Sequence, residues 1–188
     1  MDGSYTGALD AKQTKKMVVP ISPVDFSPPP SAQAWWEALQ RGPSAPLLRA
    51  LHVENTALWD LEDAARAATS SDALAGLKRS IDATNLARHA AVAALDQAVD
   101  AWYRPTAGLD TPGVVVNSES VGQLLDRLSI LALKQAAWAG RPERLAALGQ
   151  RVQLLLFCLQ RSLDALAAGR ALPQRFDEAK RYGPASPG

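Results

Sequence analysis

Three segments of the sequence, residues 46–69, 73–103 and 117–139, place acids, amides and bases three or four residues apart. At about 100° per residue, this spacing puts the polar side chains on one side of a helix, directly beside an apolar face. Burying such groups costs several kcal/mol unless they pair, so the pattern indicates a polar cleft enclosed by the three segments.

Carboxylates are the first candidates for chemistry in this cleft. Glu62, Asp82 and Asp126 are candidate catalytic residues that would work as general acids or bases, and they could also hold a divalent cation through their oxygens. The alternative interpretation is intrahelical pairing, of Glu62 with Arg66 and of Lys78 with Asp82, at spacings that favour salt bridges.

Basic, amide and aromatic residues of the same segments are candidates for binding an anionic ligand. Arginine suits bidentate contact with phosphate or carboxylate. The alternatives are neutralisation of nearby acids, hydrogen-bonded histidines, asparagines that set helix register, and a carboxylate that complements a helix dipole. The candidate ligand-binding residues are His52, Asn55, Trp59, Lys78, Asn85, Arg88, Glu119, Arg127 and Lys134, and no metal ligand is assigned.

The elements that position these residues are helices. Alanine contributes 35 and leucine 26 of the 188 residues, and both rank high in helix propensity. Caps, prolines and glycines divide the chain into helices. The sequence predicts an all-α fold, an up-down bundle of four long helices plus short flanking helices. The helices are expected over residues 32–40, 46–69, 73–103, 118–139 (capped by Asn117 or Ser118) and 142–168, with a short one near 174–181.

The ends and the composition define the domain and exclude several classes of protein. We expect a disordered proline-rich arm over residues 1–31, one helical domain over 32–181 and a disordered tail over 182–188.

The net charge of +1 argues against nucleic-acid binding, and no apolar run is long enough to span a membrane. A single cysteine and no targeting segment favour the cytoplasm. The spacing fits neither a di-iron bundle nor a glycine-rich phosphate loop.

Three ordered blocks resemble a bacterial family catalogued as domain of unknown function 4254. They read HxxNxxLWxxEDxAR at residues 52–66, KRxIDxxNxxR at 78–88 and NSESxGxxxDRLSILxLK at 117–134. The resemblance covers roughly residues 45–165. It implies a small helical cytoplasmic protein without an assigned activity or cofactor. Its association with genes of cell-envelope glycan assembly points to a phosphorylated sugar or a nucleotide sugar.

Two functions follow from these observations. The first is a cleft that binds or acts on an anionic small molecule, with or without catalysis. The second is a non-enzymatic helical interaction or adaptor protein whose buried polar residues are structural. The alanine-rich third face of the 46–69 helix, which includes Ala50, Val53, Ala57 and Ala64, could support a homodimer.

Overall fold

The computed structural model describes residues 26–104 and 117–174, and within these ranges the chain forms five α-helices and no strand. The predicted all-α fold is confirmed. Residues 1–25, 105–116 and 175–188 lie outside the described residues, and with them most of the expected arm, the short helix near 174–181 and the tail. The helices are α1 (Ala32–Arg41), α2 (Pro46–Ala67), α3 (Ser71–Tyr103), α4 (Val121–Ala137) and α5 (Pro142–Ala167).

Serine side chains cap the N-termini of three of the helices. Ser31 and Ser70 accept hydrogen bonds from backbone N–H groups in the first turns of α1 and α3, as N-cap serines do. The predicted start of the fourth helix at Asn117 or Ser118 is wrong. Its cap is Ser120, which exchanges hydrogen bonds with Gln123 in a capping box.

Helix α4 lies at the centre of the fold and contacts each of the other four helices. It is buried along one side, because leucines occupy successive turns there and small residues allow neighbours to approach. Its buried residues are Val121, Gly122, Leu124, Leu125, Leu128, Ser129, Leu131 and Ala132.

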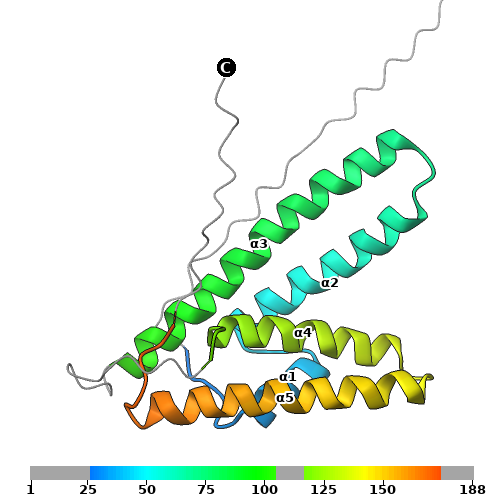
Figure 1. Cartoon of the computed structure of the whole chain (residues 1–188). Coiled ribbons are helices and arrows are strands. Elements are labelled where there is room, and N and C mark those ends of the chain that lie inside the picture. Colours follow the sequence, from blue (N-terminus) through cyan, green and yellow to red (C-terminus); the bar gives the residue numbers. More distant parts are fainter. Residues whose placement is uncertain (1–25, 105–116, 175–188) are drawn as a thin grey trace, which may run out of the picture.

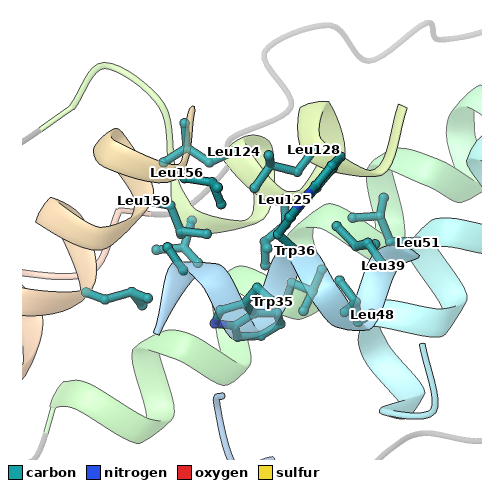
Figure 2. Close-up of a cluster of buried hydrophobic side chains, with 14 of the residues drawn as sticks. Trp35, Trp36, Leu39, Leu48, Leu51, Leu124, Leu125, Leu128, Leu156 and Leu159 are labelled. Atoms are coloured by element: carbon teal, nitrogen blue, oxygen red, sulfur yellow. The ribbon is translucent and has the colours of Figure 1, made fainter. Parts of the chain in front are cut away.

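The hydrophobic core lies where α1, α4 and α5 meet the beginning of α2 (Figure 2). Trp35 and Trp36 of α1 are 1% and 6% exposed, so the shortest helix supplies the two largest core side chains. Phe26, ahead of α1, packs against Trp35 with the ring planes tilted by 37° and the ring centroids 6.3 Å apart. Burial of aromatic surface on this scale makes α1 an integral part of the fold.

The antiparallel hairpin of α2 and α3 extends past the other helices (Figure 1). At 1.5 Å per residue, the 33 residues of α3 span about 50 Å, whereas the 17 residues of α4 span about 26 Å. Helix α4 is therefore too short to cover the hairpin as far as its turn at residues 68–70. The expected up-down arrangement of four long helices is not confirmed, because α2 and α3 diverge from α4 and α5 instead of running alongside them (Figure 1).

The start of α4 is fixed on α3 by a very close approach at Gly122. Its backbone N–H donates a 2.7 Å hydrogen bond to a carboxylate oxygen of Asp96, which is only 1% exposed. A Cβ atom at position 122 would lie 2.7 Å from the carbonyl oxygen of Val92 and 2.8 Å from the same carboxylate oxygen. Both neighbours are buried in the middle of α3, so the position accepts glycine and no larger residue without displacement of a helix.

We therefore expect Gly122→Ala to lower the free energy of unfolding by about 1–3 kcal/mol, the usual cost of overpacking a filled site. Gly149→Ala in α5 is the matched control, because a Cβ there meets no atom within 4 Å. The higher helix propensity of alanine should make the control more stable by up to about 1 kcal/mol. Urea denaturation measures both changes, and equal stabilisation of the two variants would contradict the close approach.

Candidate functional site

A cleft of about 330 Å³ opens between α2, α3 and α4. It brings together half of the residues that the sequence predicted for a site. These are Asn55, Trp59 and Glu62 from α2, Asn85 and Arg88 from α3, and Lys134 from α4. The prediction that the three polar helix faces enclose a common space therefore has a structural counterpart where α4 meets the hairpin.

Sequence analysis did not assign four further lining residues: Leu58, Arg66, Ile130 and Leu133. Arg66 lies one turn after Glu62 on the same face of α2, so helical spacing could have identified it. The three apolar residues have no such signal, because a leucine or isoleucine beside a polar face is equally typical of the core.

Behind the cleft, Asp126 of α4 joins the other two helices. The side-chain amide of Asn55 donates a 2.9 Å hydrogen bond to one carboxylate oxygen of Asp126. The Nη1 atom of Arg88 lies 3.9 Å from the other oxygen, which is an ion pair but too long for a hydrogen bond. Asn55 is 3% exposed, so this contact is shielded from water. Asp126 therefore holds Asn55 and Arg88 in place from behind the cleft.

Arg88 keeps unused hydrogen-bonding capacity at the cleft. Its Nη2 atom lies 3.2 Å from Nε2 of His89, while its buried Nε atom has no hydrogen-bond partner within the described part of the chain. A buried donor without a partner costs about 1–3 kcal/mol. Since the Nε atom is itself buried, a ligand in the cleft would contact the Arg88 guanidinium through its other nitrogen atoms.

The charges that line the cleft are predominantly positive. Arg66, Arg88 and Lys134 line it together with a single carboxylate, Glu62. The interpretation that Glu62 pairs with Arg66 is wrong, because Arg66 pairs with Asp63 instead. Neither Glu62 nor Lys134 forms an ion pair within residues 26–104 and 117–174, so both charged groups are available to a ligand.

His52 lies one turn before Asn55 and contacts α4 through a 2.9 Å hydrogen bond between its Nδ1 atom and the Ser129 hydroxyl. Burial lowers the pKa of His52 below its usual value of 6.5, because the charged imidazolium loses hydration. The residue joins the base of the hairpin to α4, next to the Asn55–Asp126 hydrogen bond.

Four predicted site residues lie away from the cleft lining. Lys78 and Asp82 are exposed on α3, and the structure shows no ion pair between them in the described part of the chain. Glu119 and Arg127 pair with each other at 2.8 Å near the start of α4. This pair is structural, since Glu119 occupies the capping region and Arg127 is 60% exposed.

Metal binding by Glu62, Asp82 and Asp126 finds no support in the geometry. No group of three histidine, cysteine, aspartate or glutamate side chains within the described ranges could hold a metal ion. None of the described helices combines the length and the apolar character that crossing a membrane requires.

The fold and the site define an all-α protein with a cleft, lined by polar and apolar side chains, between a projecting helical hairpin and a central helix. Residues 45–168 match the model of the family described as protein of unknown function (DUF4254), so the chain belongs to this family. The resemblance noted in the three sequence blocks is thereby confirmed. No curated protein and no solved structure matches the chain.

The lowered pKa of His52 predicts a pH dependence of stability. Between the folded pKa and the unfolded value near 6.5, the unfolded chain binds more protons, so stability falls as the pH drops through that interval. Urea denaturation between pH 7.5 and 5 should show a steeper loss for the wild type than for His52→Gln, which does not titrate. Other titrating groups contribute to both proteins, and identical pH profiles would contradict the assignment.

Proposed function

We propose that this protein binds, or acts on, an anionic small molecule in the cleft between α2, α3 and α4. The observation that carries the proposal is that Lys134, which has no counter-ion among the described residues, lines the same cleft as Arg88, whose ion pair with Asp126 is long at 3.9 Å. A lysine without a counter-ion among the described residues and an arginine with a long ion pair, in one concave site, favour an anion. The volume of about 330 Å³ falls within the range typical of small-molecule sites.

The roles of the acids differ in this proposal. Glu62 lines the cleft without an ion pair, so it is the carboxylate that could transfer a proton to or from a bound molecule. Asp126 is engaged by Asn55 and Arg88 and is a positioning residue. Asp82 is not among the lining residues, so we assign it no part in the site.

Lys134→Gln should weaken binding of a phosphorylated ligand by about 1.5–3 kcal/mol, the contribution of a hydrogen bond to a charged group. Calorimetric titration with inorganic phosphate, glucose 1-phosphate and AMP measures the affinity. Without ligand, the melting temperature should stay close to that of the wild type, because Lys134 has no ion pair among the described residues to lose.

Arg127→Gln is the matched control for this experiment. It removes the same charge from the same helix, but at a residue that pairs with Glu119 and does not line the cleft. We expect its affinities to equal those of the wild type. Equal weakening by both substitutions, or no binding of any of the three compounds to the wild type, would contradict the proposed site.

The second candidate function is interaction with another protein, and exposed apolar residues favour it. Leu154 and Phe157, one turn apart on α5, are 63% and 60% exposed, and the Arg161 guanidinium lies 5.7 Å from the Phe157 ring centroid. Val53 on the alanine-rich face of α2 is 46% exposed, as a homodimer contact would require. Since single exposed apolar residues are also common on monomers, these positions support the second function less strongly than the cationic cleft supports the first.

A further inference from the structure

The aromatic residue of the cleft is Trp59, and its environment differs from that of the core tryptophans. Trp35 and Trp36 are fully buried, whereas Trp59 is half-buried and lines the cleft next to Leu58. Part of its indole surface is therefore open to a bound molecule. An aromatic ring in such a position stacks favourably on another flat ring.

Helix α4 supplies the other apolar part of the cleft through Ile130 and Leu133, which are both half-buried. The cleft thus has apolar surface on α2 and on α4, with cationic groups at Arg88 and Lys134. A compact anion such as inorganic phosphate would engage the cations and leave this apolar surface in contact with water. The lining consequently fits a larger molecule that joins an anionic group to an apolar body.

Polar groups at the same surface narrow the chemistry of that body. Asn85 and Glu62 line the cleft, and neither side chain forms a hydrogen bond within the described residues. An acyl chain would displace water from both side chains and could not form the hydrogen bonds that the water had made, which is costly. A hexose could bond Asn85 and Glu62 through its hydroxyl groups, but it has no flat aromatic ring to stack on Trp59. A flat ring with apolar faces and a polar edge matches both the apolar and the polar residues of the lining.

We propose that the ligand is a nucleoside phosphate whose base stacks on Trp59 and whose phosphate contacts Arg88 and Lys134. This inference rests on the proposed anion-binding function and specifies the ligand class of the same cleft. Asn85 and Glu62 lie within the lining to bond the edge of the base. Stacking on a tryptophan accepts any base, so purine and pyrimidine nucleotides are both candidates.

Calorimetric titration of the full chain with AMP, UMP, glucose 1-phosphate and inorganic phosphate tests the inference. The better of the two nucleotides should bind at least about tenfold more tightly than glucose 1-phosphate, which is about 1.4 kcal/mol. Trp59→Leu should reduce this preference to about threefold or less, and Trp59→Phe should retain part of it. Trp102→Leu is the control, because Trp102 is 48% exposed on α3 and does not line the cleft.

The outcomes separate this inference from the proposed function. Glucose 1-phosphate that binds as tightly as AMP and UMP would overturn the nucleoside assignment and leave the anion site standing. A nucleotide preference that persists in Trp59→Leu would overturn the stacking arrangement. If none of the four compounds binds, the proposed function fails together with the inference.

Discussion

The close contact between the first turn of α4 and the middle of α3 is the constraint on which the rest of the structure depends. Gly122 and the buried carboxylate of Asp96 leave no room for a side chain between the two helices. From this contact α4 extends over the core and contacts all four other helices. Because α4 ends well short of the hairpin turn, the hairpin projects beyond α4. The cleft lies between α4 and the hairpin.

Two hydrogen bonds tie the hairpin to α4 immediately before the cleft opens, one from Asn55 to Asp126 and one between His52 and Ser129. The Asp126 carboxylate also faces Arg88 across 3.9 Å. A fixed carboxylate behind a guanidinium restricts its orientation, and a preoriented arginine loses less freedom when it binds an anion. Under the proposed function, these polar residues serve both helix packing and ligand binding, whereas in a scaffold they would serve packing alone.

Periodicity was sufficient to predict five helices and to place Asn55 and Asn85 on the polar faces of their helices, because faces follow from spacing alone. The bundle arrangement was not predictable in this way. It depends on the length of α4 relative to α3 and on the direction in which helices diverge, which hydrophobic patterns do not encode. The same limit applies to Asp82, which is exposed on α3 and is not among the residues that line the cleft. The pairing of Glu119 with Arg127 was not predictable either, because it depends on the orientation of the start of α4.

The most direct test of an anion site, as opposed to a polar scaffold, is the free energy of unfolding of wild type and Asp126→Asn, each measured with and without AMP. We expect the variant without AMP to lie within about 1 kcal/mol of the wild type, since the pair with Arg88 is long and partly exposed. AMP should stabilise the wild type more than the variant, in which Arg88 is no longer held. A loss of about 3–5 kcal/mol in the variant, with no stabilisation of either protein by AMP, would contradict the account and identify the polar residues as scaffold.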